Sequence, residues 1–178
     1  MAHSKLEDLS ANLASIDVTL GPTVAESDLQ RFERSNSVIL PVEYRTFLSH
    51  VDNGGDGPGY GLDRFDPEAM REQVGKPFPL SAAWVWDDDL RAAPALVDAC
   101  RNGWLKIGTE GCGMDWVVVV TGPQRGQVWN IEDQGAQPCA PARDFIEWYA
   151  LWVGWVAAGG DNSGRSWWDT VWADYAEK

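Results

Sequence analysis

Three consecutive carboxylates, Asp87-Asp88-Asp89, form the densest group of residues in the sequence that could bind an ion. Carboxylates bind magnesium or calcium when their oxygens converge on one point. Neighbouring side chains of a short run point in different directions, however. A calcium loop instead alternates its ligands and ends in a bidentate glutamate at position twelve, which this run lacks. We therefore predict a solvated acidic turn without a metal, or a surface that meets a basic partner.

A glycine-rich run, Gly54-Gly55-Asp56-Gly57-Pro58-Gly59-Tyr60-Gly61, is the second candidate for chemistry. Backbone N–H groups of such loops can hold phosphate when the loop leads from a strand into a helix. This run follows a predicted helix and lacks the Lys-Ser/Thr ending of a P-loop. The glycines are better explained by the backbone geometry of a loop.

Metal ligands and nucleophiles are otherwise scattered along the chain. The cysteines, Cys100, Cys112 and Cys139, form no C-x-x-C pair, and His3 and His50 are the only imidazoles. No zinc site or disulfide framework is indicated. There is no G-x-S-x-G motif, and His50 falls in the last turn of a predicted helix with no nucleophile near it in sequence. We expect no metal, no cofactor and no enzymatic activity.

Length and composition favour one globular domain with a protein partner. The 178 residues are 44% hydrophobic and 23% charged, which suits a single packed core. The formal net charge of -13 argues against nucleic acid and anionic membranes, because both attract basic surfaces. An acidic protein can attract a basic partner, although the charge can also serve solubility alone.

The sequence also predicts a location. The N-terminus, Met-Ala-His-Ser-Lys-Leu-Glu-Asp, has no apolar signal region, and no segment approaches the ~18 apolar residues of a membrane span. We therefore expect a cytoplasmic protein with free thiols and no membrane association.

Apolar residues at helical spacing predict helices at both ends of the domain. An N-terminal helix lies within residues 1–26, a second begins with Ser27 as its cap, and a third begins at Pro41 and is closed by Asn53-Gly54-Gly55. Asp66-Pro67-Glu68 resembles another helix start. Near the C-terminus, a broad aromatic stripe predicts a long helix. The stripe consists of Phe145, Trp148, Leu151, Trp152 and Trp155. The glycine-rich run at 159–164 predicts a flexible break, and the helical spacing of Trp168, Val171, Trp172 and Tyr175 predicts a terminal helix at 165–178.

The middle of the chain predicts strands. Trp104–Gly108, Trp116–Val120 and Gln127–Asn130 are separated by glycine turns and should form an antiparallel meander, with Trp116–Val120 buried on both faces. Trp84 and Trp86 alternate in strand fashion, and a short strand is expected around Tyr60. One α+β domain over 1–178 follows, with a mainly antiparallel central sheet flanked by N-terminal and C-terminal helices.

Three motifs resemble the SUKH superfamily over about residues 27–153. Leu40-Pro41-Val42-Glu43-Tyr44-Arg45-Thr46-Phe47-Leu48, closing in Asn53-Gly54-Gly55, is similar to its "LPxxYxxFL…NGG" segment. Gly103-Trp104-Leu105-Lys106-Ile107-Gly108 and the later Gly111-Cys112-Gly113, Gly122-Pro123, Arg125-Gly126 and Val128-Trp129 resemble its glycine-punctuated strands. Phe145-Ile146-Glu147-Trp148-Tyr149 with Trp152 resembles its "FxxWyxxW" helix.

The resemblance implies function as well as fold. The superfamily contains fungal cell-wall assembly regulators and bacterial immunity proteins that bind and block polymorphic toxins, many of them nucleases. None of its hallmark residues is catalytic. The resemblance implies a non-catalytic module whose partner is a protein, most simply a basic toxin domain. The alternatives are a regulatory or scaffold protein without a toxin partner, or an enzyme or ligand carrier that uses a cleft beside the sheet.

Two acidic regions are candidates for the partner surface. We favour the segment that sets Trp84 and Trp86 beside Asp87, Asp88 and Asp89, because it combines aromatic anchors with charges that steer a basic partner. The alternative is that both tryptophans are core residues and the aspartates only end a strand. The second region is the loop that carries Asp56, Asp63 and Asp66. Among the eleven tryptophans, five are predicted to be core residues (Trp104, Trp116, Trp129, Trp148 and Trp152), whereas four are less clearly buried (Trp84, Trp86, Trp167 and Trp168).

Overall fold

The computed structural model describes residues 2–69 and 71–160. Its central strand has buried side chains on both faces. Strand β3 (Met114–Val119) sends Trp116 and Val118 into one hydrophobic cluster and Val117 and Val119 into another. A strand with apolar residues on both faces must be covered on both sides. The prediction that Trp116–Val120 is buried on both faces is confirmed.

The sheet is five-stranded and antiparallel throughout, in the order β1-β5-β4-β3-β2. Strands β2 (Trp104–Gly111), β3 and β4 (Val128–Glu132) form the predicted meander. The β2–β3 turn runs through Gly111, Cys112 and Gly113, whose φ angles are all positive, a conformation that favours glycine. The edge strand β1 (Trp84–Val85) pairs with β5 (Gly135–Pro138), a strand that the sequence patterns did not indicate.

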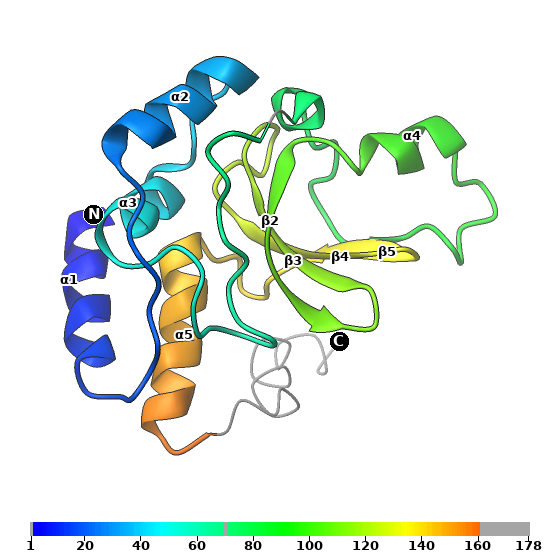
Figure 1. Ribbon diagram of the computed structural model, residues 1–178. Helices are drawn as coiled ribbons and strands as arrows, with labels where there is room; N and C mark the ends of the chain where they lie inside the picture. The colour runs from blue at the N-terminus through cyan, green and yellow to red at the C-terminus, as the bar shows by residue number, and fades with distance from the viewer. Residues whose placement is uncertain (1, 70, 161–178) are drawn as a thin grey trace.

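Four helices cover one face of the sheet (Figure 1). They are α1 (Ala2–Leu13), α2 (Glu26–Asn36), α3 (Val42–His50) and α5 (Phe145–Ala157). Helix α1 packs on α3 and α5, and Tyr44, Phe47 and the α5 aromatics share the larger cluster. Asp144 starts α5 with a capping box that includes Glu147, and Lys5 of α1 bonds both carboxylates at 2.6 Å. The fold is therefore α+β with flanking helices, as predicted.

The opposite face has a thinner cover. The segment that runs from η1 (Glu72–Gly75), whose Val74 still belongs to the larger cluster, to α4 (Pro94–Ala99) crosses this face after Phe78, and no residue of α4 is fully buried. The smaller cluster on this face contains Phe78 and Trp129, with Trp84, Trp86 and Trp104 half-buried at its border. Trp116, Trp129, Trp148 and Trp152 are core residues as predicted, whereas Trp104 is only partly covered.

Several local predictions were wrong. Ser27 does not cap α2, because the helix already begins at Glu26 and the preceding Ala25 carbonyl accepts its first backbone hydrogen bonds. Asp66-Pro67-Glu68 forms only a turn, in which Asp66 Oδ1 accepts from the Glu68 N–H. Tyr60 lies in a loop, and the neighbouring Leu62 makes a single bridge to Gly108. The predicted terminal helix and residues 161–164 of the predicted break lie outside the described residues.

Asn53-Gly54-Gly55 joins two segments instead of closing α3. The helix ends at His50, and Val51 keeps a right-handed conformation. The Asn53 side chain accepts from the Phe65 N–H at 2.6 Å and donates to the Phe65 carbonyl at 3.3 Å. Gly54 has φ +84° and packs against the Arg64 backbone, where a side chain would be strained. Close packing against residues 64–65 explains these three residues better than helix capping.

Candidate partner-binding site

Trp84 and Trp86 stand at the edge of the sheet, half in the core and half outside it. Their rings meet edge to face, with centroids 5.6 Å apart. Each indole N–H donates a hydrogen bond within the protein. Trp84 donates to Asp89 Oδ2 at 3.1 Å, and Trp86 donates to the Asp133 carbonyl at 2.7 Å. Both rings pack on the smaller cluster but remain partly exposed. They are thus neither full core residues nor free surface anchors.

The three neighbouring carboxylates have different roles. Asp89 accepts from Trp84 with one oxygen and from the Arg91 N–H with the other, at 2.9 Å. Asp87 and Asp88 are exposed. The structure therefore leaves two of the three carboxylates at the surface. Within residues 2–69 and 71–160, no group of His, Cys, Asp and Glu side chains could hold a metal ion.

A pocket of about 110 Å³ lies beside Trp86, on the thinly covered face. Trp86 and Trp104 line it, together with Val97 of α4 and Ile131 of β4. The Trp104 indole N–H is held by the Cys100 carbonyl at 2.8 Å. The charged residues that line the pocket are Arg101, Asp115, Glu132 and Asp133. The Asp87 N–H bonds the Gln134 carbonyl, so the pocket and the predicted acidic segment form one surface.

Sequence reasoning missed this pocket because it depends on contacts between distant segments. One signal was available for Asp115, since alternation along β3 places it on the same face as Val117 and Val119. Nothing in the sequence indicated that α4 and the Asp133-Gln134 turn would meet Trp86.

The second acidic region divides in a similar way. Asp56 fastens the loop to the rest of the fold, because its carboxylate accepts from the Thr19 N–H at 2.7 Å and its carbonyl accepts from the Tyr149 hydroxyl at 2.8 Å. Asp63 and Asp66 are exposed. Lys106 lies 2.8 Å from Asp115 and 4.0 Å from Asp63, so one cation lies between the pocket lining and the second acidic region.

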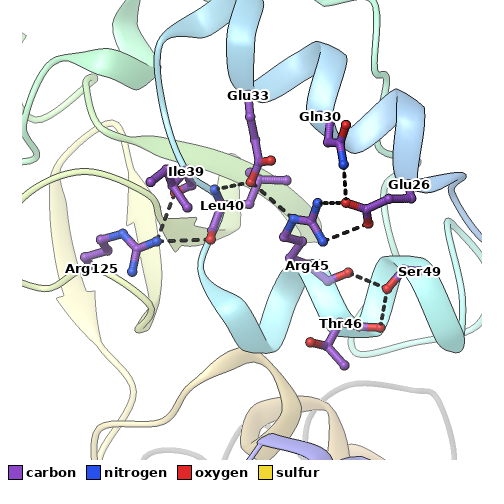
Figure 2. A network of polar contacts seen from close by, with 9 residues as sticks. All are labelled: Glu26, Gln30, Glu33, Ile39, Leu40, Arg45, Thr46, Ser49 and Arg125. Carbon is purple, nitrogen blue, oxygen red and sulfur yellow. Dashed lines mark hydrogen bonds and ion pairs between the residues drawn. The ribbon is translucent and has the colours of Figure 1, made fainter.

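A wider, open groove of about 650 Å³ runs along α2 past residues 37–39 and Arg125. Figure 2 shows that Gln30, Glu33 and Arg125 of its lining already have hydrogen-bond partners. Arg45 pairs with Glu26 and Glu33, and Glu33 also accepts from the Leu40 N–H at 2.9 Å. Arg125 donates to the carbonyls of Ile39 and Leu40, both at 3.0 Å. This network fixes the segment that leads into α3.

Neither buried thiol is an activated nucleophile. Burial raises the pKa of the Cys100 thiol to about 11 and that of Cys139 to about 12, so both stay protonated and are poor nucleophiles. His50 is exposed at the end of α3, with Nδ1 3.1 Å from the Thr46 carbonyl. Asp52 is 0% exposed, and its pKa is raised by burial although Oδ1 accepts from the Gly21 N–H.

Comparison with known proteins assigns the chain to a family. Residues 23–151 match the SMI1 / KNR4 family (SUKH-1), close to the range that the sequence motifs indicated. Neither the curated proteins nor the solved structures that were compared gave a match. Among the described helices, none is long and apolar enough to cross a membrane. Because the match covers more than two thirds of the chain, this protein belongs to the SMI1 / KNR4 family (SUKH-1).

Proposed function

We propose that this protein is a non-catalytic binding module that serves as a cytoplasmic immunity protein and neutralises a toxin by covering it. The observation that carries the proposal is the exposed pair Asp87 and Asp88 beside the half-buried Trp86 and its pocket. Interfaces commonly combine an aromatic anchor that loses its water with charges around it that select the partner. Family membership supports a protein-binding role in general.

The charge of the whole molecule fits a basic target. A net charge of -13 accelerates the encounter with a positively charged partner and disfavours acidic ones. A nuclease domain is such a partner, because its active face must attract phosphate. Carboxylates on that face would occupy the positions that phosphates normally take. A regulatory or scaffold role without a toxin is the alternative that the family match equally accommodates.

The proposal is tested by asking whether the protein neutralises a toxin that is encoded beside its gene. We expect coexpression to restore growth, the two proteins to purify together, and binding to weaken as salt is added. Titration should inhibit the toxin fully at one equivalent, as expected for a blocking protein and not for a catalyst. If the toxin stays active and does not bind, the immunity role is wrong and the scaffold alternative takes its place.

A further inference from the structure

The pocket beside Trp86 has walls of a particular chemistry. The indole N–H groups of Trp86 and Trp104 already donate to backbone carbonyls, those of Asp133 and Cys100 respectively. The rings therefore offer a ligand aromatic carbon and no hydrogen-bond donor. Val97 and Ile131 add aliphatic surface. Such a lining accepts an apolar stem, and the faces of indole rings attract cations in particular.

The charges around the pocket also favour a cationic ligand group. Three acidic residues, Asp115, Glu132 and Asp133, line it against one basic residue, Arg101, and strand alternation places the Asp115 side chain on the face of the smaller cluster. Lys106 compensates Asp115 at 2.8 Å, which leaves the other acids in excess. Asp87 is exposed, and its backbone N–H bonds the Gln134 carbonyl next to Asp133, so a further acidic residue lies beside the pocket. An acidic ligand group would be repelled here, and an apolar one would bury carboxylates without compensating them.

We propose that this pocket receives one lysine or arginine side chain of the partner protein, with the alkyl stem between Trp86 and Trp104 and the charged head at the carboxylates. The identity of the partner rests on the proposed function, whereas the chemistry of the pocket does not. A volume of about 110 Å³ exceeds what one water molecule needs but cannot admit a folded element. Long basic side chains pair an apolar stem with a charged head in this way.

Small cations test the pocket without any partner. The full chain would be titrated with n-butylammonium and n-butylguanidinium, and with 1-pentanol as an uncharged ligand of similar length, while the indole N–H signals are followed by NMR. Trp86→Phe and Trp104→Phe assign the two signals. We expect both cations to shift them saturably and the alcohol to do so much more weakly. Equal shifts by pentanol, or none by either cation, would overturn the proposal.

Charge variants sharpen the test. Asp115→Asn with Asp133→Asn should weaken butylguanidinium binding by about 3- to 10-fold, and Arg101→Gln should strengthen it by a smaller factor. Asp8→Asn with Asp17→Asn is the matched control, because these exposed carboxylates belong to the N-terminal region on the other side of the sheet. If the control weakened binding equally, general charge attraction would replace the pocket as the explanation. Should a tryptophan variant not fold, the wild-type titration still decides.

The two proposals can fail separately. If small cations bind and the toxin encoded beside the gene does not, the immunity role fails and the basic side-chain pocket stands. If the toxin binds but the cations leave both indole signals unchanged, the pocket proposal fails and the immunity role stands.

Discussion

The indole N–H of Trp84 donates a hydrogen bond of 3.1 Å to Asp89 Oδ2 across the turn that follows β1. The other oxygen of Asp89 accepts from the Arg91 N–H at 2.9 Å. Asp89 is therefore the structural member of the Asp87-Asp88-Asp89 run. Its two neighbours are exposed, which separates the residue that shapes the surface from those that are free to meet a partner.

Replacing Asp89 should cost stability, whereas replacing Asp88 should not. Asp89→Ala removes the acceptor of an indole N–H and of a backbone N–H, so we expect the free energy of unfolding to fall by about 1–2 kcal/mol. Asp88→Ala removes an exposed side chain and should change it by less than about 0.5 kcal/mol. Urea unfolding followed by tryptophan fluorescence measures both. Equal effects of the two variants would show that the Trp84 contact contributes nothing.

The network in Figure 2 predicts a difference between two glutamates that contact the same arginine. Glu33 accepts from Arg45 and from the Leu40 N–H, and its side chain is only 15% exposed. Glu33→Ala should lower the free energy of unfolding by about 1–3 kcal/mol, because the Leu40 N–H loses its acceptor. Glu26→Ala, at an exposed position, should cost clearly less. Urea unfolding of both variants checks this, and a larger loss for Glu26→Ala would contradict it.

Elements with strong local patterns were predictable from sequence. The β-branched run at Trp116–Val120 and the aromatic stripe of α5 each contain their own evidence of burial, and the structure confirms both. Family motifs added the order of the elements. Helix ends were less predictable because caps depend on single hydrogen bonds, and Ser27 was misassigned for that reason.

Only the acidic run of the candidate site could be predicted from the sequence, and the pocket could not. Asp87 and Asp88 with Trp86 could be named from the run itself, since aromatic and acidic residues stand side by side. The pocket could not, because Trp104 and Asp133 reach Trp86 only through the packing of α4 and the pairing of β5. The bonds that set Asp89 and Asp56 apart from their exposed neighbours are likewise tertiary contacts.

Asp52 should make stability depend on pH. Burial raises the pKa of Asp52 in the folded protein above the ordinary value of 3.8. At pH values between the unfolded and folded pKa, the folded protein therefore keeps the carboxyl proton that the unfolded chain has released. The stabilising effect of protonation is full below the unfolded pKa and is lost as pH rises through the folded one. Asp52→Asn lacks this group. Its free energy of unfolding relative to wild type should therefore rise from about pH 4 to about pH 7.

Urea unfolding across that pH range measures the difference for Asp52→Asn and for the control Asp17→Asn, which changes an exposed carboxylate. Subtracting wild type removes the titration of the other groups, which both proteins share. The control difference should stay nearly constant. A constant difference for Asp52→Asn as well would show that Asp52 titrates alike in the folded and unfolded states.

The exposed carboxylates of the partner surface should act on the rate of association. Asp87→Asn with Asp88→Asn leaves the Asp89 contacts intact, so thermal stability should change little. We expect association with the toxin to slow by about 2- to 5-fold at low salt and its salt dependence to flatten, because exposed interface charges act mainly on encounter. Asp8→Asn with Asp17→Asn removes the same two charges elsewhere, so it separates position from net charge. Stopped-flow or surface binding measurements over a series of salt concentrations give both quantities. If the two double variants slow association equally, the Asp87-Asp88 surface is not the point of contact, and the exposed Asp63 and Asp66 become the next residues to replace.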